Sequence, residues 1–121
     1  MQPEQRDAGY LWDMLDHART IGVLAGETTF QQYLNDRKLQ LAVERCMEII
    51  GEAARQVSKA FKDAHPEIPW RRIIAQRNIL AHEYRDIRQQ RLWMVVTQRV
   101  PELVALLEPW IPPAPPETEG G

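Results

Sequence analysis

The stretch that decides the fold is AVERCMEIIGEAARQVS, residues 42–58. Its apolar side chains recur every three or four positions, which is the period of an amphipathic helix and not the alternation of a strand. The same stripe continues on both sides, so we predict one long helix over about residues 36–64. The members of this stripe are Leu39, Ala42, Val43, Cys46, Ile49, Ile50, Ala53, Val57, Ala60 and Phe61.

Gly51 lies inside this predicted helix. A glycine in a helix interior costs about 1 kcal/mol relative to alanine, and the usual compensation is a second helix that approaches closely. We therefore expect a close helix neighbour at Gly51.

Helical periodicity also precedes the long segment. Residues 7–25 form a predicted first helix, which Gly26 ends. Thr28 and Gln31 are spaced as a capping box, so they predict a short helix that carries Phe30.

The pattern after the long helix is interrupted by HPEIPW, residues 65–70, because its two prolines cannot both lie inside one helix. A third main helix is predicted to begin at Pro69 or Trp70, since proline fits the first turn of a helix. A fourth is predicted to begin near Asp86, and Pro101 should kink it.

These elements predict an all-α protein, an antiparallel four-helix bundle with an extra short helix. The helical domain is predicted over residues 1–110. Residues 111–121, which include PPAPPETEGG, have too few apolar side chains to pack and are predicted to be a disordered, proline-rich tail.

Composition narrows the class of protein further. With 121 residues, 44% of them hydrophobic and 26% charged, the chain is typical of one globular domain. It has no apolar run of the ~20 residues that a membrane span needs and no signal-peptide pattern at its start. Its single cysteine, Cys46, excludes an internal disulfide and favours a cytoplasmic location.

The charge balance does not indicate general affinity for nucleic acids, because 15 basic residues face 17 acidic ones. Arginines nevertheless cluster within 21 positions, and this cluster is either a solvated face or a phosphate-binding surface. The cluster comprises Arg71, Arg72, Arg77, Arg85, Arg88 and Arg91.

Several other polar residues have ordinary structural interpretations. Cys46 lies on the buried stripe, so we expect an inert thiol. Glu48 and Glu52 are four positions apart and should form a surface ion-pair ladder with the flanking Arg45 and Arg55.

The histidines outside the third main helix give no metal-ligand spacing. We expect His17 and His65 to be surface or helix-end residues, and Asp13 and Asp16 to belong with His17 to a solvated face. The sequence therefore predicts no metal site and no cofactor.

RNILAHEY, residues 77–84, is the stretch that carries chemistry. Arg77 lies on an apolar stripe with Trp70, Ile73, Leu80 and Tyr84. A cation on that stripe needs either a carboxylate partner or a solvated cleft, because an unpaired buried charge is prohibitive.

Arg77 and His82 do not share a helix face. Five positions turn a helix by about 140°, whereas Asn78 and His82, four apart, lie on one face. Either the long arginine side chain wraps round its helix, or two chains dimerise so that both pairs converge in a groove. A symmetric dimer would place this face of Arg77 against its twin, with a phosphate as the missing counter-charge.

These residue types suit attack on a phosphodiester. Arg77 offers a planar fork of donors that matches phosphate oxygens, and His82 can move a proton near neutral pH. RNA supplies its own nucleophile, the 2′-hydroxyl, so that cleavage needs a base, an acid and a charge stabiliser but no metal. Asn78 could orient the phosphate or the imidazole.

RNILAHEY resembles the Arg-x4-His-x-Tyr signature of the HEPN ribonucleases, specifically the HepT-like toxins of bacterial and archaeal toxin–antitoxin pairs. The likeness extends further. Residues 42–58 resemble the long central helix of that family with its Gly-Glu-Ala step, and IPWRRIIAQRNILAHEY, residues 68–84, resembles its active-site helix. The resemblance covers about residues 10–110.

The resemblance implies a four-helix bundle that forms a two-fold homodimer, with both motifs lining one cleft, and a metal-independent endoribonuclease. Arg77 and His82 match the two catalytic positions, and Asn78 matches the polar residue that follows the arginine. Tyr84 matches the tyrosine to which a minimal nucleotidyltransferase antitoxin attaches AMP. The chain departs from the family at IAQ, residues 74–76, where a glycine and a methionine are more common.

Two interpretations from different classes follow. The first is an RNase toxin that its nucleotidyltransferase partner neutralises. The alternative is a non-catalytic dimeric helical adaptor that binds a nucleotidyltransferase or nucleotides. The first predicts a homodimer whose interface includes the third main helix and part of the long helix near Gly51. The position of Tyr84 on the apolar stripe, taken alone, fits a core residue equally well.

Overall fold

The structure is a computed structural model, which describes residues 5–82 and 89–111. All regular secondary structure within these ranges is helical, so the predicted all-α class is confirmed. The elements are α1 (Gln5–Ala25), α2 (Phe30–Leu34), α3 (Arg37–Gln56), α4 (Lys59–Ala64), α5 (Trp70–His82), α6 (Gln89–Met94), the π-helix η2 (Val95–Arg99), α7 (Val100–Leu107) and the 3₁₀-helix η3 (Glu108–Trp110).

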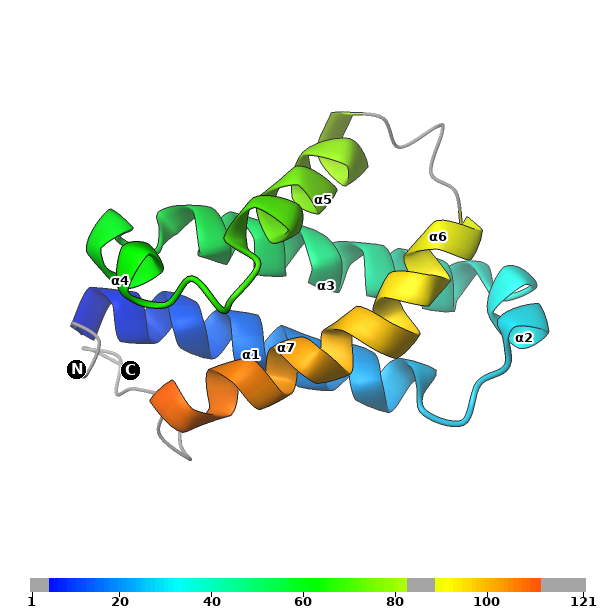
Figure 1. Ribbon diagram of the computed structural model, residues 1–121. Helices are drawn as coiled ribbons and strands as arrows, with labels where there is room; N and C mark the ends of the chain where they lie inside the picture. Colours follow the sequence, from blue (N-terminus) through cyan, green and yellow to red (C-terminus); the bar gives the residue numbers. More distant parts are fainter. Residues whose placement is uncertain (1–4, 83–88, 112–121) are drawn as a thin grey trace, which may run out of the picture.

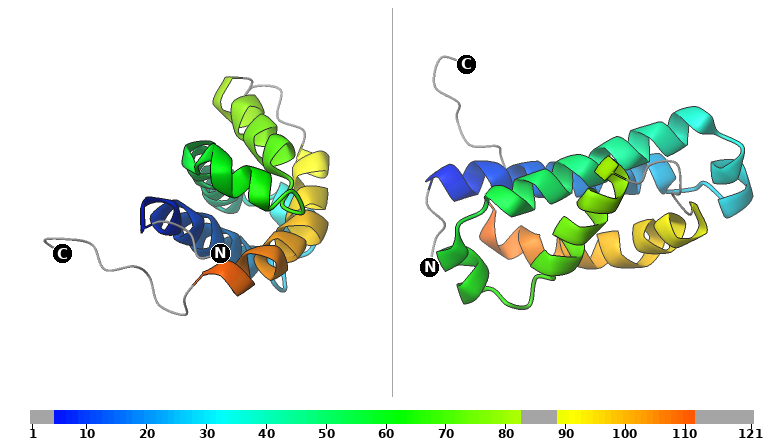
Figure 2. Two further views of the ribbon diagram at one scale, coloured as in Figure 1. Left: turned by 60° about the vertical axis from the view of Figure 1, so that its left-hand side comes forward. Right: turned by 90° about the horizontal axis from the view of Figure 1, so that it is seen from above.

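The long helices α1 and α3 form the centre of the molecule and run side by side in opposite directions (Figure 1). Helix α5 packs on α3, and α7 packs along α1, so that α3 lies between α1 and α5 (Figure 2). The core between these helices is fully apolar at its centre. Its most deeply buried side chains include Leu11, Met14, Leu15, Ile21, Tyr33, Val43, Ile50, Ile68, Leu92 and Leu107.

The start of the chain follows the prediction, with one shift. Helix α1 ends at Ala25, and Gly26 begins a turn. The capping box of α2 is formed by Thr29 and Gln32, so the predicted pair was wrong by one position. Thr28 instead closes the turn after α1, because its N–H donates to the carbonyl of Ala25 at 3.0 Å.

The predicted helix over residues 36–64 is two helices. Asp36 caps the first by accepting from the N–H of Leu39 at 3.0 Å, and Ser58 Oγ caps the second by accepting from the N–H of Phe61 at 3.2 Å. Val57, between them, is extended. Because Val57 and Phe61 are both buried, the apolar stripe continues across the break, and the sequence pattern therefore does not indicate it.

Asp7 of α1 holds this break in place. Its buried carboxylate accepts from the N–H of Ser58 at 2.9 Å and from Ser58 Oγ at 2.6 Å. The start of α1 is thereby fixed to the junction of α3 and α4.

The last helical segment bends round its proline by changing its hydrogen bonds. Pro101 has no N–H, and residues 95–99 before it form the π-helix η2, at whose end the N–H of Val100 donates to the carbonyl of Val95. Such a π turn is a usual way to accommodate a proline. The predicted start near Asp86 lies outside the described residues.

The end of the described chain packs in the core, since Ile111, the first residue of the predicted tail, is buried. The rest of that tail, residues 112–121, lies outside the described residues. Across the helices that the structure describes, none has the length and apolar character to cross a bilayer.

Candidate active site

Helices α3 and α5 touch at Gly51. A Cβ atom built on Gly51 would lie 2.0 Å from Cβ of Arg77, 2.7 Å from its Cγ and 3.1 Å from the carbonyl oxygen of Ile73. The predicted close neighbour is therefore confirmed, and it is α5 of the same chain. Gly51 consequently gives no support to a dimer interface, which corrects that part of the sequence interpretation.

Replacing Gly51 by alanine should destabilise the protein although alanine is the better helix former. Overpacking costs about 1–3 kcal/mol, which exceeds the roughly 1 kcal/mol gained in helix propensity. Gly22→Ala is a matched control, because a Cβ at Gly22 would meet nothing within 4 Å. Urea unfolding should place Gly51→Ala below the wild type and Gly22→Ala above it; the reverse order would mean that the two helices separate easily.

The Arg77 side chain lies where these helices meet. It is 23% exposed, and Nη2 lies 3.1 Å from Oε2 of Glu52 on α3. Its Nη1 donates to Oδ1 of Asn78 at 3.2 Å. The expected carboxylate partner thus exists within the chain, and the expectation that Arg77 lacks a counter-charge until phosphate binds was wrong.

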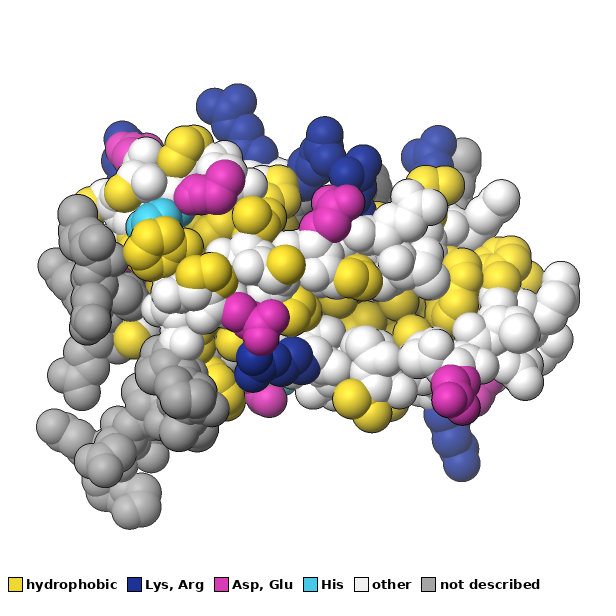
Figure 3. Space-filling model, turned by 60° about the horizontal axis from the view of Figure 1, so that its bottom comes forward, with side chains coloured by type: hydrophobic (Ala, Val, Ile, Leu, Met, Phe, Trp, Pro, Cys, Tyr) yellow, Lys and Arg dark blue, Asp and Glu magenta, His cyan; other side chains and the backbone are white. Residues whose placement is uncertain are grey.

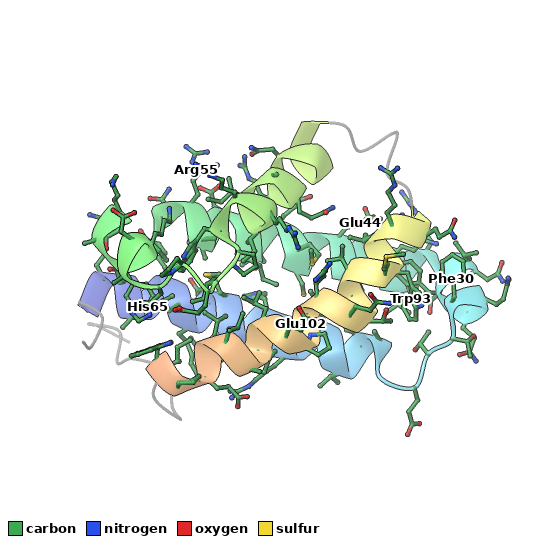
Figure 4. All side chains as sticks on the ribbon, viewed as in Figure 1. Phe30, Glu44, Arg55, His65, Trp93 and Glu102 are labelled. Atoms are coloured by element: carbon green, nitrogen blue, oxygen red, sulfur yellow. The ribbon has the colours of Figure 1, made fainter. Side chains whose placement is uncertain are left out.

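The predicted ion-pair ladder on α3 exists in part. Glu48 pairs with Arg45 at 3.3 Å, as expected. Glu52, however, pairs with Arg77 and not with Arg55, whose exposed side chain points away from the helix pair (Figure 4). Oε1 of Glu52 accepts from Nε2 of Gln56 at 3.4 Å.

A cleft of about 230 Å³ opens beside the Arg77–Glu52 pair, so Arg77 has a solvated cleft as well as a carboxylate partner. Polar and apolar atoms contribute about equally to its lining, and it contains charges of both signs. Its lining residues are Tyr10, Asp13, Arg45, Glu48, Ile49, Glu52, Ala53, Gln56 and Arg77. Tyr10 and Asp13 come from α1, and sequence spacing gave no signal that they would meet α5. Burial is the main effect that raises the pKa of Asp13, with Asp16 adding to it and His17 opposing it.

The predicted catalytic residues share α5. Asn78 is exposed, and position 82, one helical turn further on, lies on the same face of the helix. Since Arg77 donates to Asn78, the guanidinium turns towards that face. Of the two predicted arrangements, this favours the one in which the Arg77 side chain wraps round its own helix. The side chain of His82 and the whole of Tyr84 lie outside what the structure describes.

The residues given ordinary interpretations mostly keep them. Cys46 is buried and free, and burial raises the pKa of its thiol, as fits an inert side chain. His17 is half-buried, and its Nδ1 lies 2.7 Å from the carbonyl oxygen of Asp13. Within residues 5–82 and 89–111, no group of three or more His, Cys, Asp or Glu side chains is arranged to hold a metal ion.

His65 is a helix-end residue, as predicted, because it caps the C-terminus of α4, but it is buried and not on the surface. Its ring lies between those of Phe61 and Trp110, with centroid distances of 4.2 and 4.3 Å, at the connection from α4 to α5 (Figure 4). Its carbonyl oxygen accepts from Nε1 of Trp70 at 3.0 Å. It thus joins the start of α5 to η3 and is not among the residues that line the Arg77 cleft.

Figure 3 shows the molecule from below relative to Figure 1. The described residues form no broad basic area on this face. Charged side chains of both signs are scattered over it, and hydrophobic side chains gather between them (Figure 3). This agrees with the near-neutral net charge of −2.

Known proteins resemble this chain over most of its length. The family described as Ribonuclease HepT-like matches residues 14–109. A protein of Thermococcus cleftensis named "Probable ribonuclease HepT" is 38% identical over 99 residues, which cover 82% of this chain and 90% of that protein. A candidate RNase of Methanocaldococcus jannaschii is 33% identical over 94 residues, or 78% of this chain and 86% of the relative. No solved structure matches the chain significantly.

Proposed function

The chain belongs to the HepT-like ribonuclease family and is an RNase, and from this premise we propose that Arg77 and His82 cleave RNA without a metal ion. The observation that carries the proposal is the placement of Arg77. A half-buried arginine at the edge of a cleft with charges of both signs, whose contacts to the described residues leave part of its donor fork unused, is suited to a phosphate.

In the proposed reaction the RNA attacks itself. A base removes the proton of the 2′-hydroxyl, the 2′-oxygen bonds to the neighbouring phosphorus, and the bond from phosphorus to the 5′-oxygen breaks as that oxygen receives a proton. The products are a 2′,3′-cyclic phosphate and a 5′-hydroxyl. His82 moves the protons, Arg77 stabilises the charge that develops on the phosphate oxygens, and Asn78 orients the guanidinium through its hydrogen bond.

One imidazole cannot easily be base and acid at once, and a two-fold dimer would supply two. We therefore propose an antiparallel four-helix subunit that dimerises through α5 and part of α3. A second hollow, of about 340 Å³, lies along these helices and η2–α7, and its lining supports the proposal. Its apolar members are Met47, Ile50, Pro69, Ile73, Ala75, Val95, Val100, Leu103 and Leu106.

The dimer has a direct prediction. At micromolar concentration, light scattering should report a particle of about twice the 14.1 kDa of one chain. Ile73→Glu, which puts a charge into the apolar hollow on α5, should shift the particle towards the monomer. A 14.1 kDa particle throughout the micromolar range would contradict the dimer.

The biological role follows from the same family. We propose that the protein is the toxin of a toxin–antitoxin pair, acting in the cytoplasm, and that a minimal nucleotidyltransferase neutralises it by attaching AMP to Tyr84. Buried, unpaired Cys46 is compatible with that reducing compartment.

RNase activity is tested with pure protein and RNA in the presence of EDTA. We expect fragments on a gel, and no fragments from the His82→Ala protein. Intact RNA with the wild type would favour the dimeric adaptor instead.

A further inference from the structure

Glu52 is a charged group of the cleft to which the proposed chemistry gives no role. It follows Gly51, at the point where the backbone of α3 comes closest to Arg77. Its Oε2 atom is screened from solvent and lies 3.1 Å from Nη2 of Arg77, yet no hydrogen bond to it is aligned within the described residues. The charge of the guanidinium is therefore what compensates this buried oxygen.

This contact restricts Arg77. A free arginine side chain samples many rotamers, and it loses this conformational freedom when it binds a phosphate. Here Glu52 holds Nη2 from one side while Asn78 holds Nη1 from the other. These two contacts engage both ends of the fork, and within the described residues they leave some of its five N–H donors without a partner.

We infer that Glu52 is a positioning residue, which holds the guanidinium of Arg77 in the orientation that receives the scissile phosphate. The inference rests on the proposed function. Glu52 does not bind the phosphate itself, because two anions repel each other, and it moves no proton. Its contribution is to orient Arg77 before the RNA arrives, when misplacement of a charge stabiliser by about 1 Å can cost about 100-fold in rate.

The chain offers a matched control for this role. Glu48 lies one turn earlier on α3, lines the same cleft and has a similar exposure, 34% against 45% for the Glu52 side chain. It pairs with Arg45 and not with Arg77. Glu48→Ala therefore changes the charge of the cleft by the same amount as Glu52→Ala while leaving the contact with Arg77 intact.

The test is steady-state cleavage of one defined RNA by the full chain, in EDTA. Glu52→Ala should lower kcat about 10–100-fold with KM unchanged or lower, since the cleft loses a negative charge. Glu52→Gln, which keeps the length and one acceptor oxygen but not the charge, should fall between Glu52→Ala and the wild type. Glu48→Ala should keep the wild-type kcat. Circular dichroism should give all three variants the wild-type helix content.

A second arm asks whether Glu52 acts through Arg77. Under single-turnover conditions with excess protein and long incubation, which can follow a residual rate about 10²–10³-fold below wild type, the protein with both Arg77→Ala and Glu52→Ala should be no slower than Arg77→Ala alone, because a residue that only positions another has nothing left to do. A further loss in the double variant would contradict the inference.

Three other results would overturn it. They are a wild-type kcat in Glu52→Ala, an equal loss in Glu48→Ala, and faster cleavage by Glu52→Ala, which would mean that Glu52 competes with the phosphate. In each of these cases, the proposed function would still hold if the wild type cleaves RNA and the Arg77→Ala protein does not. RNA left intact by the wild type would instead remove the proposed function.

Discussion

Alanine at Arg77 or at His82 is expected to abolish RNA cleavage and growth inhibition while leaving the fold intact. Loss of a proton-transfer group typically costs 10²–10⁴-fold, and loss of one charge-stabilising donor costs about 10²–10³-fold. These are the largest effects on rate that we predict. Initial rates on a labelled RNA, compared at equal protein concentration, measure them.

Arg71→Ala is the control for Arg77. It removes an exposed arginine from the first turn of the same helix, α5, and so tests whether any arginine there matters. We expect less than a tenfold loss, as for an outer phosphate contact. Wild-type cleavage by either Arg77→Ala or His82→Ala would remove that residue from the mechanism.

Tyr84→Phe should produce a protein that folds, cleaves RNA and resists its partner enzyme. The change removes the oxygen that would accept AMP and keeps the ring. An AMP group on Tyr84, which belongs to the same sequence motif as Arg77, would bring a phosphate to this arginine and fill the cleft with a nucleotide. The modification should therefore inhibit RNA cleavage without unfolding the protein. Growth assays with and without the nucleotidyltransferase measure the resistance.

Mass spectrometry after co-expression identifies the modified residue. An AMP-sized adduct should appear on the wild type and disappear in Tyr84→Phe. Tyr10→Phe is the matched control, because Tyr10 lines the same cleft as Arg77. An adduct that persists in Tyr84→Phe, or neutralisation that proceeds unchanged, would mean that control runs through another residue or through complex formation alone.

Local patterns in the sequence predicted the helices well. The stripe over residues 36–64 gave most of the buried face, although its member Ala60 is exposed and it omitted buried Met47 and Ala54. Gly26 and Pro69 marked the right helix boundaries. The stripe did not predict the break at Ser58, because a period of apolar residues indicates which side chains are buried and not whether the helix continues in the same direction. Ser58 caps α4 through a local contact, but its bonds to Asp7, 51 positions away, are not contained in any local signal.

The contacts around Arg77 were predicted only in part. The cost of a glycine inside a helix correctly indicated a close neighbour at Gly51, but it could not say whether the neighbour belonged to the same chain. Spacing on α3 paired Glu52 with Arg55, because both lie on one helix, whereas the observed partner is Arg77 on α5. Charge pairing between helices depends on how they cross, which helical periodicity does not encode.

The most direct test of the central claim is cleavage of an RNA in which one nucleotide, the one 5′ of the cut, carries a 2′-deoxy sugar. If the 2′-hydroxyl is the nucleophile that His82 activates, this RNA should resist cleavage at that position in EDTA. The unmodified RNA should give a 2′,3′-cyclic phosphate end. Cleavage of the deoxy-substituted strand at the same position, or a 5′-phosphate on the downstream fragment, would contradict the account.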